Sequence, residues 1–307
     1  MYDVLIIGAG PAGLTAAIYA RRYGHSVLVF EKLIYGGQVS NTPDVENYPA
    51  ISRITGADFA TNLYTQATDL GAQVIFEEVQ AVSLEGAEKT VITANGTYQG
   101  RTVIIANGAQ RRTLGCPGED TFSGRGVSYC ATCDGAFYKD QDVAIVGGGN
   151  TALEDALFLS NLCTNVHILH RRDAFRGNPI LVQALEKKPN IHIHFDTTVE
   201  EILGKEKLEG IKVRNTQTQK TEIIPVKGVF VAIGLAPENQ LFADTLPLDR
   251  SGYLQADERC TTSIAGVFVA GDTRQKVLRQ IVTATSDGAI AAFEASNYLN
   301  QQAAVEQ

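Results

Sequence analysis

The chain has 307 residues, of which 44% are hydrophobic and 20% charged, so it is long enough for two domains with separate cores. Its net charge of −8 argues against a nucleic acid or an anionic membrane as partner, because both attract a basic surface. No stretch approaches the roughly 20 uninterrupted apolar residues of a membrane span. The five cysteines form no disulfide framework, so we expect a cytoplasmic protein.

The N-terminal stretch is predicted to form a strand, a glycine-rich loop, a helix and a second strand. Tyr2–Ile7 and Ser26–Phe30 are the strands, and Pro11–Tyr23 is the helix. The GxGxxG loop brings backbone N–H groups and a helix N-terminus close to a pyrophosphate, and it contains Gly8, Gly10, Pro11, Ala12 and Gly13. Glu31 follows the second strand, where a carboxylate accepts the hydroxyls of an adenosine ribose and repels a phosphorylated one.

Thr102–Ala106 is the next clear strand, and the turn-rich Leu114–Gly118 after it is predicted to cross into a second domain. Cys130 and Cys133 then form a CxxC motif, followed by Asp134. A redox dithiol, a zinc site and two unrelated buried thiols are all open interpretations. We favour the dithiol, because no second CxxC or nearby histidine completes a zinc site and Asp134 is placed to transfer a proton. The other three cysteines are expected to be structural: Cys116, Cys163 and Cys260.

The order of strand, loop, helix and strand then repeats over Asp142–Val146, Thr151–Asn161 and Asn165–Leu169. The spacing repeats as well, because 23 positions separate Gly8 from Glu31 and Gly147 from His170. The second loop contains Gly147, Gly149, Asn150, Thr151 and Ala152. In place of the acidic residue it has His170, followed by Arg171, Arg172 and Arg176. Guanidinium groups pair with a 2′-phosphate, so this site is predicted to prefer NADPH over NADH.

The C-terminal part is predicted to return to the first domain. Gly228–Ile233 is a strand that ends at Gly234, and the turn-rich Leu235–Asn239 is the second crossing. Gly266–Asp272 contains a returning strand, and Arg279–Tyr298 is the closing helix. The predicted fold class is α/β, with two Rossmann-like dinucleotide-binding domains. Residues 114–241 form the second domain, inserted into a discontinuous first domain of residues 1–113 and 242–307.

Taken together, these motifs resemble the bacterial low-molecular-weight thioredoxin reductases. The resemblance runs in order along nearly the whole chain, through Gly36-Gly37-Gln38, Pro117-Gly118-Glu119, Val127–Gly135, the two glycine loops, His170-Arg171-Arg172, Gly271-Asp272 and Arg279-Gln280. It implies FAD in the first domain and NADPH in the inserted one. It further implies that electrons pass through the flavin to a Cys130–Cys133 disulfide and on to thioredoxin. In this interpretation Cys133 faces the flavin, Cys130 attacks thioredoxin and Asp134 is the acid–base group.

The resemblance also implies which residues hold each cofactor. Those expected at FAD are Gly8, Gly10, Pro11, Ala12, Gly13, Glu31, Lys32, Gly37, Gln38, Asn47, Ala106, Gly108, Gly271, Asp272, Arg279, Gln280 and Ile281. Those expected at NADPH are Gly147, Gly149, Asn150, Thr151, Ala152, His170, Arg171, Arg172, Arg176, Ile233 and Gly234. A homodimer and a rotation of one domain against the other are implied too, with the two crossings as hinges.

Three further points complete the prediction. His192 and His194 alternate in a predicted strand and so share one face. No further metal-ligating residue accompanies them in the sequence pattern, so no metal site is expected. A flavin disulfide reductase that uses ferredoxin or another donor is the alternative within this fold, and the arginine cluster weighs against it. A non-enzymatic, redox-regulated flavoprotein is the alternative of another class, and the CxxC motif beside two nucleotide sites weighs against that.

Overall fold

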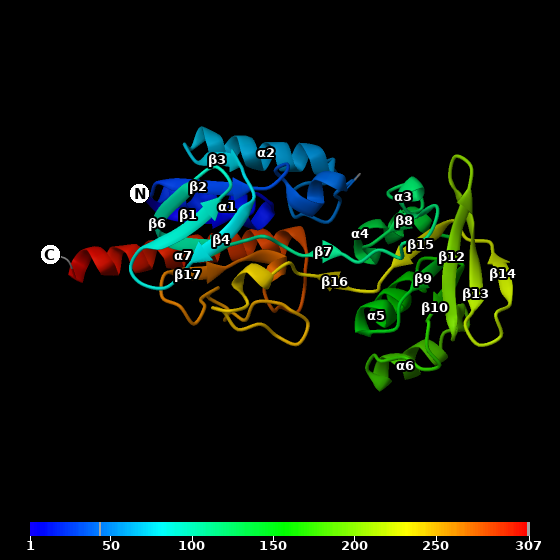
Figure 1. The fold of residues 1–307 in the computed structure, drawn as a ribbon. Helices are drawn as coiled ribbons and strands as arrows, with labels where there is room; N and C mark the ends of the chain where they lie inside the picture. Colours follow the sequence, from blue (N-terminus) through cyan, green and yellow to red (C-terminus); the bar gives the residue numbers. More distant parts are fainter. Residues whose placement is uncertain (43, 306–307) are drawn as a thin grey trace. The chain divides into compact units, whose positions relative to one another are not determined.

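The structure is a computed structural model that describes residues 1–42 and 44–305 (Figure 1). The chain forms two compact units: the first unit contains residues 1–110 and those from 236 onward, and the inserted unit contains residues 111–235. The chain crosses between them in β7 (Gln110–Arg111) and β16 (Leu235–Ala236), which pair with each other. The first crossing precedes the predicted Leu114–Gly118 stretch, because the buried Glu119 carboxylate accepts the N–H groups of Leu114 and Gly115 inside the inserted unit.

The first unit is built on a sheet in the order β3-β2-β1-β6-β5-β4, with β17 beside β6. β1, β2, β3, β6 and β17 run parallel, while β4 and β5 add an antiparallel edge. The strands are β1 (Tyr2–Ile7), β2 (Val27–Glu31), β3 (Gln73–Phe76), β4 (Val79–Ser83), β5 (Lys89–Thr93), β6 (Thr97–Ile105) and β17 (Val267–Val269). The helices are α1 (Pro11–Arg22), η1 (Gly37–Asn41), α2 (Gly56–Asp69), η3 (Gln240–Phe242), η4 (Gly271–Thr273) and α7 (Ile281–Val305).

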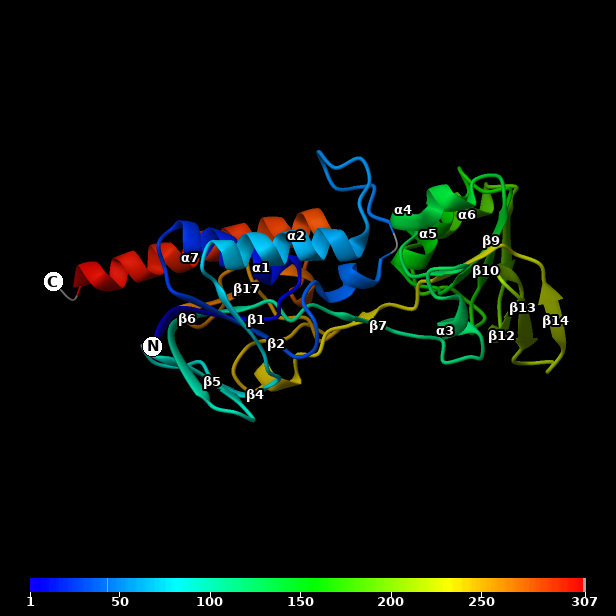
Figure 2. The ribbon, with the colours of Figure 1, turned by 90° about the horizontal axis from the view of Figure 1, so that it is seen from above.

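Both faces of this sheet are covered, which explains why β1 and β2 are nearly continuous apolar runs. On one face, α1 and α7 pack over Val4, Ile6 and Ile104, and Figure 2 shows α1, α2 and α7 side by side there. On the other face, Leu5 and Phe30 pack against Phe242 and other residues of the 241–267 segment. The α1 sequence can pack this closely because four of its eight buried residues are alanine.

The inserted unit has a parallel sheet in the order β11-β10-β9-β15-β8 and an antiparallel sheet β12-β13-β14. Helices α4, α5 and α6 cover one face of the parallel sheet, and the antiparallel sheet covers the other (Figure 1). The strands are β8 (Val127–Ser128), β9 (Asp142–Val146), β10 (Asn165–Leu169), β11 (Ile191–His194), β12 (Thr197–Gly204), β13 (Leu208–Asn215), β14 (Thr221–Ile224) and β15 (Gly228–Val231). The helices are α3 (Glu119–Phe122), α4 (Ala131–Asp134), η2 (Gly135–Tyr138), α5 (Asn150–Leu159) and α6 (Pro179–Glu186).

The predicted α/β class and the repeated βαβ order are confirmed by β1-α1-β2 and β9-α5-β10. The closing helix is longer than the predicted Arg279–Tyr298 and extends to Val305, because the residues after Tyr298 include neither glycine nor proline. None of the helices in the described part of the chain has the length and apolar character that crossing a membrane requires.

Candidate functional site

In the first unit, the glycine loop joins β1 to α1, which begins at Pro11 directly after the N-cap residue Gly10. Gly8 has a φ of +106°, and a Cβ there would lie 2.4 Å from the carbonyl oxygen of Ala106. A Cβ on Gly13 would lie 1.8 Å from the carbonyl oxygen of Gly8. A Cβ on Gly10, in contrast, would meet only the Cα of Gly37, at 4.0 Å. Packing therefore requires glycine at positions 8 and 13, while the backbone at Gly10 is open to a ligand.

The acidic residue of the first repeat lies over this loop. The Glu31 carboxylate accepts hydrogen bonds from the N–H groups of Ala9 at 3.0 Å and Leu33 at 3.1 Å. Asn47 donates to the side-chain oxygen of Gln280 at 3.0 Å, which brings together two predicted cofactor residues from distant parts of the chain. Lys32 forms an exposed ion pair with Glu238 at 3.0 Å. The other predicted residues lie at element ends: Gly37 and Gln38 in η1, Ala106 and Gly108 after β6, and Ile281 at the start of α7.

A third segment of the first unit meets the glycine loop at Gly271, whose φ is +80° and where a Cβ would lie 2.8 Å from the Cβ of Ala12. Asp272 comes next, and its Oδ1 is buried without a hydrogen-bond partner. Burial raises the pKa of Asp272, and the charges of Lys276 and Arg279 oppose that shift. An unpartnered buried oxygen costs free energy, so it fits a site where the hydroxyl of a bound cofactor donates to it.

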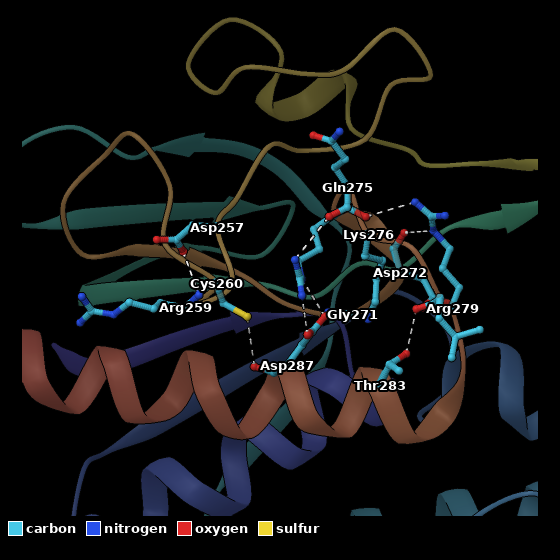
Figure 3. A network of polar contacts seen from close by, with 12 residues as sticks. Asp257, Arg259, Cys260, Gly271, Asp272, Gln275, Lys276, Arg279, Thr283 and Asp287 are labelled. Carbon is cyan, nitrogen blue, oxygen red and sulfur yellow. Dashed lines mark hydrogen bonds and ion pairs between the residues drawn. The ribbon is translucent and has the colours of Figure 1, made fainter.

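No sequence motif predicts the ion-pair network that holds this turn. The Asp287 carboxylate, on α7, accepts from Arg274 Nε and Nη2 at 2.9 Å each, from Lys276 Nζ at 2.8 Å and from Gly271 N–H at 3.0 Å. Figure 3 shows Asp287 reaching from the helix toward Gly271 and Lys276. Burial alone would raise the pKa of Asp287, but the hydrogen bonds from Arg274 and Lys276 outweigh it and lower the pKa. The carboxylate is therefore charged and fixes the turn that carries Asp272.

In the inserted unit, the second glycine loop joins β9 to α5 in the same way. A Cβ on Gly147 would lie 2.5 Å from the carbonyl oxygen of Ala232, whereas one on Gly149 would meet nothing within 4 Å. Asn150 accepts a hydrogen bond from Asn178 N–H at 2.7 Å, and Asn178 caps α6, which starts at Pro179. Thr151 and Ala152 lie in the first turn of α5, while Ile233 and Gly234 follow β15. This loop too is open where a pyrophosphate is expected.

The basic residues of the second repeat divide into one buried ring and three exposed side chains. The His170 ring packs against Gly148, where a Cβ would lie 2.2 Å from its Nδ1, and its Nε2 is buried without a partner. Burial and the nearby arginines lower the pKa of His170, so the ring is neutral. The exposed side chains are Arg171, Arg172 and Arg176. Among the described residues none of these three forms an ion pair, so they are available to an anion.

The CxxC motif lies at the start of α4 and is oxidised. Cys130 and Cys133 form a disulfide, with Cα atoms 5.3 Å apart. The two cysteines are therefore not unrelated thiols, and the described residues contain no group of three or more potential ligands arranged to hold a metal ion. The other three thiols are free, and burial raises the pKa of Cys116 and Cys163 to about 11 and that of Cys260 to about 12. They remain protonated at neutral pH, which suits their predicted structural role.

A polar cluster that the sequence analysis also missed surrounds this disulfide. Ser128 lies at the end of β8, and its Oγ donates a hydrogen bond to Asp134 Oδ2 at 2.6 Å. The Tyr129 hydroxyl donates to the buried Glu119 carboxylate at 2.9 Å, and Arg111 lies over the Tyr129 ring at 5.0 Å. Arg111 also attracts the Asp134 carboxylate electrostatically. The proton-transfer candidate Asp134 therefore contacts the Ser128 hydroxyl and lies in the field of the Arg111 guanidinium.

Three histidines form a cluster on β10 and β11. His167 Nδ1 lies 3.1 Å from His194 Nε2, and the His167 and His192 rings stack with centroids 5.0 Å apart. His192 Nε2 lies 3.1 Å from Asn165 Oδ1. Burial, followed by the charges of His194 and His192, lowers the pKa of His167 from 6.5 to about 4. The predicted shared face of His192 and His194 is confirmed, because both rings contact His167.

This cluster predicts an acid-sensitive inserted unit. Because the folded-state pKa of His167 lies below its ordinary value, folding favours the neutral ring, and stability falls as pH drops from 6.5 toward about 4. His167→Gln should flatten that decline in the Tm of the inserted unit, followed by circular dichroism. At pH 8, where the ring is neutral in both states, the Tm values give the cost of lost packing alone. An equal decline in parent and variant would contradict this assignment.

Comparison with known proteins agrees with this geometry. The family model described as pyridine nucleotide-disulphide oxidoreductase matches residues 2–288. The chain is 43% identical to a thioredoxin reductase of Listeria innocua, over 98% of this chain and 95% of that one. It is 45% identical to a thioredoxin reductase of Streptomyces coelicolor, over 97% and 94%. The crystal structure of thioredoxin reductase from Streptococcus pyogenes matches with a TM-score of 0.94 at 42% identity, over 98% and 99%. The chain therefore belongs to the pyridine nucleotide-disulphide oxidoreductase family, among the thioredoxin reductases.

Proposed function

We propose that this protein is an NADPH-dependent thioredoxin reductase that contains FAD and uses the Cys130–Cys133 disulfide as its redox centre. The observation that carries the proposal is this disulfide, followed directly by Asp134 and built into a unit with its own nucleotide loop. A structural disulfide would need neither the neighbouring acid nor the nucleotide sites.

The first unit is the proposed FAD site. Its support is the open backbone at Gly10, the Glu31 carboxylate over the loop and the unpartnered Oδ1 of Asp272. The start of α7 at Ile281 follows the expected FAD residues Arg279 and Gln280 directly, and a positive helix end stabilises negative charge. The inserted unit is the proposed NADPH site, with Gly149 open to the pyrophosphate and three exposed arginines for the 2′-phosphate. The chemistry that bound FAD would supply is electron transfer: it couples hydride transfer from NADPH to the two-electron reduction of a disulfide.

The proposed roles of Cys130, Cys133 and Asp134 follow from the electrons and protons that disulfide reduction consumes. Opening the Cys130–Cys133 bond consumes two electrons and two protons, and Asp134 is the proposed group that gives and takes a proton at the sulfurs. The Cys130 thiolate attacks the thioredoxin disulfide and releases one thioredoxin sulfur as a thiol. Cys133 then attacks Cys130 in the mixed disulfide, which releases reduced thioredoxin and restores the Cys130–Cys133 bond.

Three parts of the proposal concern larger-scale behaviour. Cys133 is proposed to face the flavin, and the crossings at β7 and β16 are proposed as hinges for a domain rotation that lets nicotinamide and dithiol alternate there. We propose that a thioredoxin is the protein partner and that this chain works as a homodimer in the cytoplasm.

An anaerobic titration tests the electron donor. NADPH should bleach the flavin absorbance of the purified protein at far lower concentration than NADH. Arg171→Ala and Arg176→Ala should each weaken NADPH binding by roughly tenfold, because each removes a charge-assisted hydrogen bond to phosphate. NADH binding, which lacks that phosphate, is the matched control and should not change. If NADPH fails to bleach the flavin and reduced ferredoxin succeeds, the donor assignment is overturned.

A further inference from the structure

The hydroxyl of Ser128 donates a short hydrogen bond to the proposed acid–base group Asp134, and no sequence motif assigns Ser128 a role. Its Oγ lies 2.6 Å from Asp134 Oδ2, 3.3 Å from the Cys130 carbonyl oxygen and 3.1 Å from the Cys130 N–H. The side chain is buried, with 4% of its surface exposed. One hydroxyl therefore contacts both the acid and the backbone of a redox cysteine.

We propose that Ser128 is a positioning residue that holds Asp134 beside the Cys130–Cys133 disulfide and keeps it hydrogen-bonded in both of its protonation states. This inference rests on the proposed role of Asp134 in proton transfer. The hydrogen bonds that Ser128 can form explain how the half-buried Asp134 carboxyl can gain or lose its charge.

The Ser128 hydroxyl has the hydrogen and the lone pairs that both protonation states of Asp134 need. A serine hydroxyl has one hydrogen to donate and two lone pairs to accept with, and Cys130 N–H occupies one lone pair. When Asp134 is a carboxylate, the hydroxyl donates to Oδ2. When a proton arrives on Oδ2, that proton is donated to the second lone pair, and the hydroxyl turns to donate to the Cys130 carbonyl oxygen. The charged state uses two of these contacts and the neutral state all three. In the charged state the Cys130 carbonyl oxygen still accepts from Asp134 N–H at 3.1 Å, so proton transfer leaves none of these groups unpaired.

The surroundings of Ser128 fix this geometry. Ser128 pairs with Phe230 of β15, and Val127 beside it is in the core of the inserted unit. Asp134 is the last residue of the short helix α4, and Cys130 is its N-cap residue. The Asp134 N–H donates to the Cys130 carbonyl oxygen at 3.1 Å. Arg111 and Tyr138 also interact electrostatically with Asp134: Arg111 remains charged, and burial raises the pKa of Tyr138 to about 12. Neither of these two groups changes charge between pH 5 and 9, so neither adds a pH-dependent charge of its own beside Asp134.

The test is the pH dependence of disulfide opening in the holoenzyme, with dithiothreitol as the reductant. In Ser128→Ala the carboxylate loses a charge-assisted donor, so the pH midpoint of the reaction should move upward by about one unit. Ser128→Thr keeps the hydroxyl and should restore the parent midpoint. In an Asp134→Asn background, Ser128→Ala should produce no shift.

A midpoint that Ser128→Ala leaves unchanged, with the rate reduced equally at every pH, would overturn the proposal. So would an equal shift in the Asp134→Asn background. If the alanine variant does not fold, Ser128→Gly is measured in its place against the same prediction. Reduction by dithiothreitol needs neither NADPH nor thioredoxin, so this test does not depend on the proposed function. Failure of the proposed function would be seen separately, as a lack of NADPH-dependent turnover in the parent.

Discussion

Cys130→Ser and Cys133→Ser are each expected to lower NADPH-dependent thioredoxin reduction by roughly a thousandfold or more, because covalent exchange needs both sulfurs. Flavin reduction by NADPH should persist, since the substitutions leave both nucleotide loops intact. The two variants should differ in detail. Cys130→Ser retains the sulfur proposed to contact the flavin and should show a thiolate-to-flavin charge-transfer band, whereas Cys133→Ser should lack it.

The matched control is Cys116→Ser, which changes a half-buried cysteine of the same unit that is not in the disulfide. Its thiol is protonated at neutral pH, because burial raises its pKa to about 11. Turnover in this variant should stay near that of the parent. The dithiol assignment fails if either Cys130→Ser or Cys133→Ser reduces thioredoxin at the parent rate.

Asp287→Ala is expected to destabilise the first unit by about 3–5 kcal/mol, because it leaves the buried cations of Arg274 and Lys276 without their carboxylate. Only 7% and 6% of these two side chains are exposed, so water cannot replace the lost partner. The expected change in Tm is a decrease of roughly 10 °C. FAD retention should fall as well, because the Gly271 N–H contact that fixes the Asp272 turn is lost.

The measurements are thermal unfolding and the flavin content after gel filtration. Arg53→Gln is the control within the same unit, since it breaks a pair with Asp44 in which 63% of the arginine side chain is exposed. Surface pairs contribute little, so its Tm should hardly change. An Asp287→Ala protein that unfolds at the parent temperature and keeps its flavin would show that the network does not position the turn.

The sequence predicted the repeated architecture well, because its signals are local. Gly8 and Gly147 each follow a buried strand and open the loop before a helix, and these backbone requirements are visible in the spacing of the glycines. Pro179 marks the start of α6 for a similar reason, since proline fixes the first turn and Asn178 caps it. The antiparallel sheet β12-β13-β14 was not predicted, although the alternation of residues such as Val199 and Ile211 with charged neighbours was a usable signal.

The parts of the site that could not be predicted are contacts between distant or unremarkable residues. Asp287 lies inside a helix, and no spacing rule links it to Arg274 and Lys276. Ser128 belongs to the quoted Val127–Gly135 motif, yet only the folded chain shows its hydroxyl at the Asp134 carboxylate. The first crossing also depended on tertiary structure, because the Glu119 carboxylate draws Leu114 and Gly115 into the inserted unit.

Counting electrons shows whether the Cys130–Cys133 disulfide receives electrons from NADPH through the flavin. In an anaerobic reductive titration, the parent should take up two electron pairs per FAD, one for the flavin and one for the disulfide. Cys133→Ser should take up one pair. Free thiols counted after NADPH addition should rise by two per chain in the parent and not at all in the variant. One pair in both proteins, with no new thiols, would show that the disulfide stands outside the electron path.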